Sequence, residues 1–375
     1  MEFIKPTVQI KLYGLDHLRA LAIILVFLFH YQFFFGHPEW FPKIIKFCWT
    51  GVDLFFVLSG FLISSQLFAQ IKKKGEFSIK KFYLKRFFRI IPVYLAVVGI
   101  YFCFPFFRER ETLPPLWKFL TFTQNLGLKS NELTFSHAWS LCVEEHFYLF
   151  LPLFLIFFLR TSFFKKSYLT LIFLFLVGFV IRFYCWNQIY LPKISGGFVL
   201  SYWGDSIYYP TYNRLDGLIM GVSIAALYQY SPKLFSKVSK FGNSLILLGI
   251  LVLTFVYFFC SEFASFSLSI FGFPLIAIGY GLMVLGALSP TSLLYKWNSK
   301  TTTFIATLSY AIYLSHKGLI HMFQQIFSNW GIVKNSNLML LICLTLSVVG
   351  AWVLNSTIEK PFMRLRWKII KEKNL

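Results

Sequence analysis

An arginine and a histidine share one apolar stretch near the N-terminus, residues 14–36. Arg19 and His30 are eleven residues apart. In an α-helix they would lie on nearly the same face, about 16 Å apart along the axis. Lipid tolerates neither side chain, so this face is expected to look into a protein cavity or onto another helix. An unpaired histidine at that depth should be neutral, because desolvation disfavours the charged ring, and a neutral ring can accept a proton.

The stretch HAWSLCVEEHFYL, residues 137–149, carries carboxylates and histidines into the start of another apolar run. Ionisable groups inside a membrane are costly, so they need a function or a partner. Glu145 and His146 are expected to point away from the main polar face. The structural alternative is that the two glutamates bond to arginines of neighbouring spans. Spacings of three and four predict that four residues share that polar face: His137, Ser140, Glu144 and Tyr148.

Two more arginines, Arg86 and Arg89, end the most basic segment of the chain, residues 71–89. Their spacing makes them neighbours on one helical face. Because arginine binds phosphate through two parallel hydrogen bonds, the pair is a candidate phosphate clamp near a membrane surface. Membrane topology and lipid headgroups are the alternative explanation, and they account better for the three lysines at 72–74.

The remaining ionisable residues within apolar runs are few. Asp53 begins the second run, where it either caps a helix or orients a buried imidazole or cation. Arg214 and Asp216 are two residues apart and face different ways, so each is expected to bond to another helix; structural and substrate-shaping roles both remain open. Tyr313 and His316 share one face of the ninth run.

These residues must be positioned by membrane helices. The chain has 375 residues, of which 57% are hydrophobic and 14% charged. Runs of about 20 apolar residues are long enough to cross a membrane as helices, and the ~10-residue alternating segments of a β-barrel are missing. We therefore expect an all-α polytopic bundle with ten spans: 14–36, 51–70, 90–107, 138–159, 167–186, 209–229, 242–260, 267–288, 302–324 and 337–357.

The basic residues between these runs predict the orientation. Segments on the N-terminal side of the membrane carry 24 lysines and arginines, against 8 on the other side. The positive-inside rule then puts both termini in the cytoplasm. This bias and attraction to anionic lipid explain the net charge of +21, which therefore does not indicate nucleic-acid binding.

The chain reads as one domain, residues 1–375, with a basic cytoplasmic tail over 358–375. The six cysteines are scattered singly, so neither a disulfide framework nor a metal site is expected. No bound cofactor is indicated either. A soluble catalytic domain after the last span is not expected, so any chemistry should take place in the membrane.

Seven motifs occur in order along the chain: Arg19-x10-His30, GVDLFFVLSGF, KRFFRIIPVY, HAWSLCVEEHFYL, YNRLDGLIMG, SYAIYLSH and IEKPF. In them the sequence closely resembles the acyltransferase-3 family of bacterial integral-membrane acyltransferases, which includes O-acetyltransferases of lipopolysaccharide O-antigen and other surface glycans. The resemblance covers essentially the whole chain. Two departures are visible: Cys142 stands where serine is common, and no extracellular SGNH-type domain is expected after the last span.

The resemblance implies transfer of an acyl group, usually acetyl from acetyl-CoA, to a carbohydrate hydroxyl. Arg19 and His30 match the family's paired residues of the first helix, and Glu144 matches the first glutamate of its SLxxEE motif. The expected catalytic residues are His30 and Glu144. The expected acyl-CoA-binding residues are Arg19, Arg86 and Arg89. Supporting or acceptor-side roles are expected for Asp53, His137, Trp139, Glu145, Tyr148, Arg214, Asp216, Tyr313 and His316.

Several alternatives stay open at this point. His30 could be a general base towards the acceptor hydroxyl, or it could carry the acyl group itself. Glu144 could orient the imidazole or the acceptor. The acceptor could be O-antigen, peptidoglycan, exopolysaccharide, or a small lipid-linked or secreted molecule. A transporter or flippase would also place His, Glu and Arg in the membrane, but such proteins often show inverted repeats, which we do not find. A non-catalytic scaffold is the third possibility.

Overall fold

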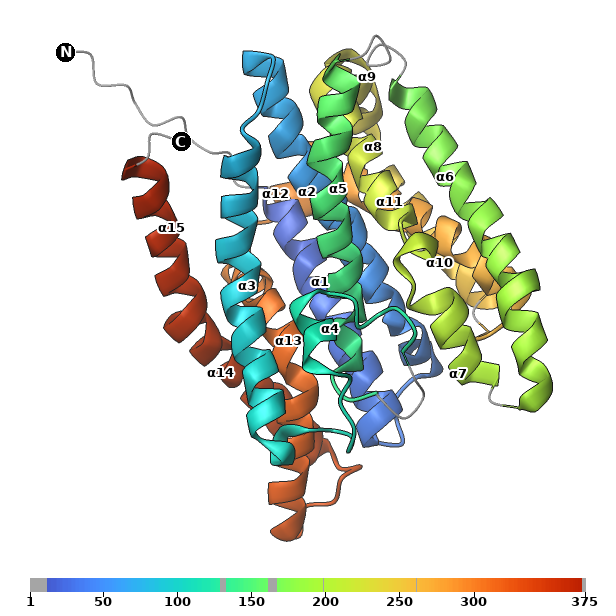
Figure 1. Cartoon of the computed structure of the whole chain (residues 1–375), viewed down its shortest axis with the longest axis vertical. Helices are drawn as coiled ribbons and strands as arrows, with labels where there is room; N and C mark the ends of the chain where they lie inside the picture. The colour runs from blue at the N-terminus through green and yellow to red at the C-terminus, as the bar shows by residue number, and fades with distance from the viewer. Residues whose placement is uncertain (1–11, 129–132, 161–166, 198, 261, 373–375) are drawn as a thin grey trace.

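The computed structural model describes residues 12–128, 133–160, 167–197, 199–260 and 262–372. All regular elements in these ranges are helices, which form one bundle (Figure 1). The expectation of an all-α architecture is confirmed. The longer helices are α1 (Tyr13–His30), α2 (Gly51–Lys74), α3 (Ile79–Cys103), α5 (Trp139–Arg160), α6 (Ser167–Tyr184), α8 (Asp216–Tyr230), α10 (Gly242–Phe259), α11 (Phe273–Leu288), α13 (Lys300–Asn329), α14 (Asn337–Leu354) and α15 (Lys360–Glu372).

Short helices connect them: α4 (Leu116–Leu120), α7 (Val199–Trp203), α9 (Pro232–Val238) and α12 (Leu293–Lys296). In the described ranges, eight helical segments are long and apolar enough to span a membrane. The two other expected spans fall on α8, which has 15 residues, and on α13, which has 30 residues but a more polar composition. A multi-pass membrane protein is therefore supported, while the count of ten remains a prediction.

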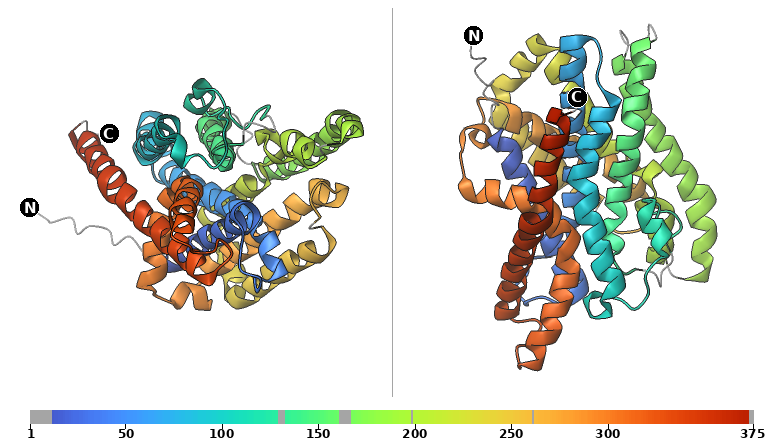
Figure 2. Two further views of the ribbon diagram at one scale, coloured as in Figure 1. Left: turned by 90° about the horizontal axis from the view of Figure 1, so that it is seen from below. Right: turned by 60° about the vertical axis from the view of Figure 1, so that its left-hand side comes forward.

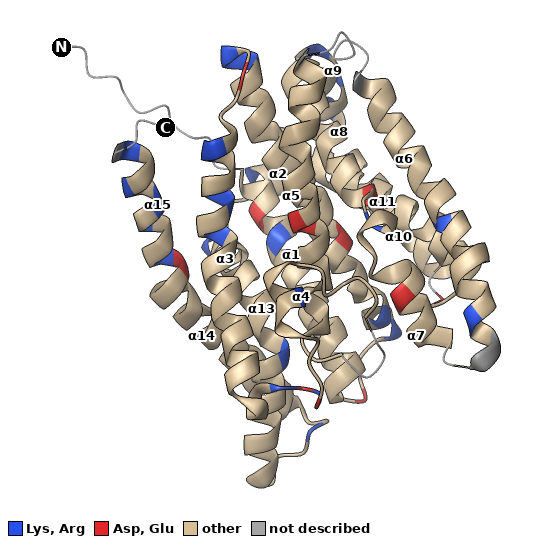
Figure 3. Ribbon diagram, viewed as in Figure 1, with Lys and Arg blue, Asp and Glu red and all other residues tan. Residues whose placement is uncertain are grey.

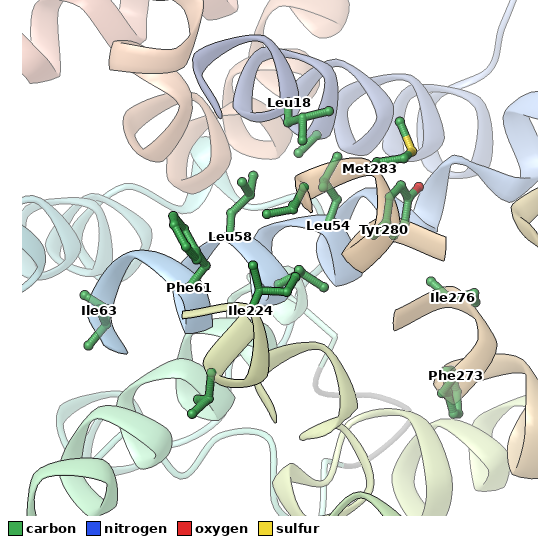
Figure 4. Close-up of a cluster of buried hydrophobic side chains, with 14 of the residues drawn as sticks. Leu18, Leu54, Leu58, Phe61, Ile63, Ile224, Phe273, Ile276, Tyr280 and Met283 are labelled. Atoms are coloured by element: carbon green, nitrogen blue, oxygen red, sulfur yellow. The ribbon is translucent and has the colours of Figure 1, made fainter. Parts of the chain in front are cut away.

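The centre of the bundle is the packing of α1, α2, α8 and α11. Figure 4 shows Leu54 and Leu58 of α2 beside Ile224 of α8 and Met283 of α11. Glycine permits the closest crossing: a Cβ atom added at Gly60 of α2 would lie 2.3 Å from the backbone oxygen of Leu218 in α8. Small residues at helix contacts are how membrane helices approach closely. This crossing fixes α2, which carries part of the candidate site.

One helix boundary differs from the sequence-based expectation. Residues 71–89 were expected to lie between the spans 51–70 and 90–107, but α2 continues to Lys74 and α3 already begins at Ile79. The break is confined to the residues around Gly75, which adopts φ +76° and ends α2. Ser78 then caps α3, because its hydroxyl accepts a hydrogen bond from the backbone N–H of Lys81. As a result Arg86 and Arg89 lie within the long helix α3, and their helical spacing agrees with the expectation.

The peripheral elements frame this centre. Figure 2 shows α15 alongside α3, and the predicted basic tail is thus helical over Lys360–Glu372. Figure 3 shows Lys and Arg gathered where α2 ends and α3 begins, and also charged residues in the middle of the bundle on α1, α2 and α5. Parts of the predicted topological signal, in residues 1–11, 129–132, 161–166 and 373–375, lie outside the described residues.

Candidate active site

A cavity of about 280 Å³ opens among α1, α2, α3, α5 and α13. It brings together residues from distant parts of the chain, including all of the predicted acyl-CoA-binding residues and one predicted catalytic residue. We call it the arginine cavity. Its polar and aromatic-hydroxyl lining consists of Arg19, Ser59, Gln66, Arg86, Arg89, Ser140, Glu144, Tyr148, Ser309, Tyr310 and Tyr313.

The three arginines lie near the N-terminal ends of α1 and α3. Arg19 lies in the second turn of α1, and Arg86 and Arg89 lie in the second and third turns of α3. Within the described residues, none of the three guanidiniums has a hydrogen bond to a protein group or an ion pair within 4.0 Å, although Arg86 lies 5.7 Å from the centre of the Tyr148 ring. Three positive groups with free donors around one cavity form a site for an anionic ligand.

Glu144 is held by hydroxyl groups rather than by arginine. The hydroxyl of Ser59 in α2 donates to Oε1 at 2.9 Å, and the hydroxyl of Tyr148 donates to Oε2 at 3.1 Å. Both carboxylate oxygens are therefore oriented. Ser140, Glu144 and Tyr148 all line the cavity, as their shared helical face predicted. His146 points elsewhere, as expected: its Nδ1 lies 2.8 Å from the hydroxyl of Thr211. Glu145 does not line the cavity.

Three buried histidines form a second group, the histidine cluster. Nδ1 of His30, at the end of α1, lies 2.7 Å from Nε2 of His316 in α13. The ring of His137, from the 3₁₀ helix Ser136–Ala138, lies 5.0 Å from that of His316 and 5.7 Å from that of His30. None of the three lines the arginine cavity. His137 therefore faces the cluster and not the cavity lined by Ser140, Glu144 and Tyr148.

Tyr313 lies between the two groups. Its hydroxyl is 2.6 Å from that of Ser140 and also donates to the backbone oxygen of His137. Its ring is part of the cavity lining, and it also packs 5.5 Å from the His137 ring. The paired hydroxyls of Tyr313 and Ser140 thus close the arginine cavity on the side of the histidine cluster. Sequence spacing identified Tyr313 but could not show this position.

A buried ion pair borders the histidine cluster. Nζ of Lys317 lies 2.9 Å from Oε1 of Glu109, and both side chains are almost fully buried. The same ammonium group lies 4.3 Å from the centre of the Phe34 ring. Sequence spacing did not single out Glu109, because this residue belongs to a segment of mixed charge between two expected spans. Its burial depends on contacts that sequence spacing does not show.

The other predicted residues form a separate group of ion pairs. Oδ1 of Asp53 accepts a hydrogen bond from Nη2 of Arg214 at 2.7 Å, and Arg182 of α6 donates to Asp216 at 2.6 Å. Arg214 and Asp216 therefore each bond to another helix, as expected. Asp53 orients a cation rather than an imidazole. Trp139 packs on Arg214, 5.2 Å from its guanidinium. None of these residues lines the arginine cavity.

A larger cavity, of about 770 Å³, lies between α5, α6 and α8. Phenylalanine, leucine and valine side chains make up most of its wall, with His146, Thr211 and the Arg182–Asp216 pair along one part. Its size is typical of a ligand site. Its wall, however, lacks the convergent free cations and the oriented carboxylate of the smaller cavity. The chemistry therefore points to the arginine cavity.

The fold and the site thus define a helical membrane protein with an arginine-lined cavity beside a buried histidine cluster. Comparison with known families makes the class specific. A family model described as "Acyltransferase domain" matches residues 12–356, and the chain belongs to this family, acyltransferase-3. The family resemblance inferred from the seven motifs is thereby confirmed.

Named relatives support the same class. The chain is 30% identical over 330 residues to "Peptidoglycan O-acetyltransferase OatA" of Listeria monocytogenes, covering 82% of this chain and 49% of that protein. It is 26% identical to "O-acetyltransferase OatA" of Staphylococcus aureus, covering 82% and 50%, and 25% identical to a "Putative O-acetyltransferase" of Staphylococcus aureus strain COL, covering 95% and 58%. The chain thus spans about half the length of these curated relatives. No solved structure matches it.

Proposed function

We propose that this protein is a membrane O-acetyltransferase, which moves an acetyl group from cytoplasmic acetyl-CoA to a hydroxyl of a cell-envelope carbohydrate. One observation carries the proposal: Arg19, Arg86 and Arg89 surround one cavity that also holds the oriented carboxylate of Glu144. Membership of the acyltransferase-3 family and the names of the relatives support the reaction type.

The donor binds through its phosphates. CoA carries several phosphate groups at one end and a slender thioester arm at the other. A cavity of about 280 Å³ is near the small end of the ~300–1,000 Å³ range of ligand sites, so it fits the arm better than the whole molecule. In this arrangement Arg86 and Arg89 bind phosphate near the basic end of the bundle. The thioester then extends along the cavity towards Tyr313.

The orientation of the protein follows from the same reasoning. Arg19 lies near the start of α1, and the paired arginines lie near the start of α3, beside the end of α2 that carries Lys72 and its neighbours. The positive-inside rule assigns this end to the cytoplasm, where acetyl-CoA is available. We therefore propose an inner-membrane location with both termini in the cytoplasm.

In the proposed reaction, His30 acts as general base. Its ring takes the proton of the acceptor hydroxyl, and the resulting oxygen nucleophile attacks the thioester carbonyl. The new C–O bond forms, the C–S bond breaks, and the CoA thiolate leaves and takes up a proton. General-base catalysis of this kind typically contributes about 10²–10⁴-fold. Since Tyr313 and Ser140 close the cavity towards His30, this pair must separate during the reaction.

The role of Glu144 changes in light of its contacts. It bonds to Ser59 and Tyr148, whereas the ring of His30 bonds to His316. These contacts do not support the alternative in which Glu144 orients the imidazole of His30. We assign Glu144 to the donor side, where its carboxylate fixes two hydroxyl groups at the cavity wall.

The acceptor belongs to the carbohydrates of the envelope, and peptidoglycan is the first to examine because a named relative modifies it. The test is mass spectrometry of envelope glycans from cells with the gene, without it, and with His30→Ala. We expect one glycan to lose its acetyl mass in both mutants. Unchanged acetylation of every envelope glycan would refute the proposed function.

A further inference from the structure

His30 contacts a second imidazole and not a carboxylate. A neutral histidine has one ring nitrogen that donates a hydrogen bond and one that accepts. The 2.7 Å contact between Nδ1 of His30 and Nε2 of His316 therefore needs one donor and one acceptor. Which ring donates decides which nitrogen of His30 keeps its lone pair.

The surroundings of His316 answer this question. Its Nδ1 lies 2.9 Å from the backbone oxygen of Ile312 and 2.9 Å from that of Tyr313, one turn earlier in α13. Backbone oxygens only accept hydrogen bonds, so Nδ1 of His316 must carry the hydrogen. In the neutral ring Nε2 is then the acceptor. His30 must donate from Nδ1, which leaves the lone pair on its Nε2.

The charges around the cluster favour this neutral form. Lys317 follows His316 in α13 and already places one positive charge there, paired with Glu109. His137 of the adjoining 3₁₀ helix contributes a third imidazole, and Tyr313 contributes a hydroxyl. In the described part of the chain, a charged His316 would have no carboxylate within ion-pair distance. Burying an unpaired charge is unfavourable, and His316 is completely buried.

We infer that His316 is the positioning residue of the site: it fixes His30 in the form that has hydrogen on Nδ1 and a free lone pair on Nε2. The use of Nε2 of His30 as a base rests on the proposed function. The position of the hydrogen on Nδ1 does not depend on that function. Serine hydrolases orient their histidine with a buried aspartate. In this bundle a neutral imidazole anchored to the backbone does so without adding a charge inside the membrane.

Nitrogen-15 NMR of histidine-labelled protein in lipid nanodiscs tests the hydrogen position directly, because the two neutral forms differ in their nitrogen shifts. His30→Ala identifies the signals of His30. We expect the Nδ1–H form in the wild type and its loss in His316→Leu. An Nε2–H form of His30 in the wild type would overturn the inference, whatever the protein's activity.

Kinetics test the consequence. We expect His316→Leu to lower kcat for acetyl transfer by about 10²-fold or more, with the affinity for acetyl-CoA unchanged, since the wrong nitrogen is then available to the substrate. His316→Gln offers an amide oxygen to the same hydrogen and should stay within about tenfold of the wild type. His321→Leu is the matched control, because it removes another imidazole from α13 outside the cluster.

The outcomes separate the inference from the proposed function. Equal rates in His316→Leu and His321→Leu would overturn the positioning role. Equal losses in His316→Leu and His316→Gln, with intact acetyl-CoA binding, would also overturn it, because the accepting atom would then not be what matters. If the wild type has the Nδ1–H form but no envelope glycan depends on the gene for its acetyl groups, the proposed function fails and the hydrogen position stands.

Discussion

The double substitution Arg86→Gln and Arg89→Gln should weaken acetyl-CoA binding strongly. Each arginine loses charge-assisted hydrogen bonds worth about 1.5–3 kcal/mol. At about 1.4 kcal/mol per tenfold change, the pair together would raise Kd by about 10²–10⁴-fold. Both side chains are only partly buried, so water screens them to some extent. We therefore expect the lower half of this range, about 10²–10³-fold.

Folding should be largely unaffected by this change. In the described structure neither guanidinium makes a hydrogen bond or an ion pair with the protein, so no buried partner is left unsatisfied. The thermal midpoint of the purified double variant should therefore stay close to that of the wild type. A large drop in the midpoint would mean that these arginines hold the bundle together, contrary to the role proposed for them.

The assay is titration calorimetry with acetyl-CoA and protein in lipid nanodiscs at fixed salt. Lys85→Gln is the matched control, because it removes the same charge from the adjacent position of α3 but does not line the arginine cavity. We expect this control to change Kd less than about threefold, because Lys85 is partly buried like the two arginines but lies outside the cavity. Unchanged affinity in the double variant, or an equal loss in the control, would refute phosphate binding by Arg86 and Arg89.

Three further outcomes are expected. His30→Ala should abolish transfer but leave acetyl-CoA binding intact, and intact-protein mass spectrometry of the wild type with donor alone should show no added acetyl; an adduct that His30→Ala loses would instead make His30 an acyl carrier. Reporters fused after Leu375 should indicate the cytoplasm, and reporters within 199–205 should indicate the outside, whereas a C-terminus outside would contradict the span count. Asp53→Ala should destabilise the protein by about 3–5 kcal/mol, because it leaves Arg214 buried without its partner; an unchanged thermal midpoint would contradict this.

Sequence patterns predicted those structural features that depend only on residues close together in the sequence. Apolar runs predicted the long helices, because a run of about 20 apolar residues can be recognised in the sequence without knowing what packs against it. The spacing of Ser140, Glu144 and Tyr148 predicted their common face for the same reason, since a helix repeats every 3.6 residues. His137 was expected on that face too, but it lies in the preceding 3₁₀ helix and faces the histidine cluster. Asp216 and Arg214 were expected to bond to different helices, and they bond to Arg182 of α6 and Asp53 of α2. Each of these results needs no knowledge of which helix lies beside which.

The contacts between helices could not be predicted in this way. His30 and His316 are 286 residues apart, and no spacing rule connects them. The third span was expected to start at residue 90, because only the apolar residues were counted; the helix itself begins at Ile79, after the cap at Ser78. Glu109 was overlooked for a similar reason: an acidic residue in a charged segment attracts notice only when its buried partner, Lys317, is known.

The arginine cavity and the histidine cluster are separate in the structure, and this separation affects the proposed reaction. A thioester in the arginine cavity and the base at His30 lie on opposite sides of the hydroxyl pair formed by Tyr313 and Ser140. As long as this pair is closed, His30 cannot activate water that enters with the donor. Excluding water in this way prevents hydrolysis of a reactive group before the acceptor arrives. Tyr313→Ala should therefore raise hydrolysis of acetyl-CoA without acceptor, and Ser140→Ala, which keeps the ring in place, should raise it less. If neither variant hydrolyses acetyl-CoA faster than the wild type, the hydroxyl pair is not the barrier.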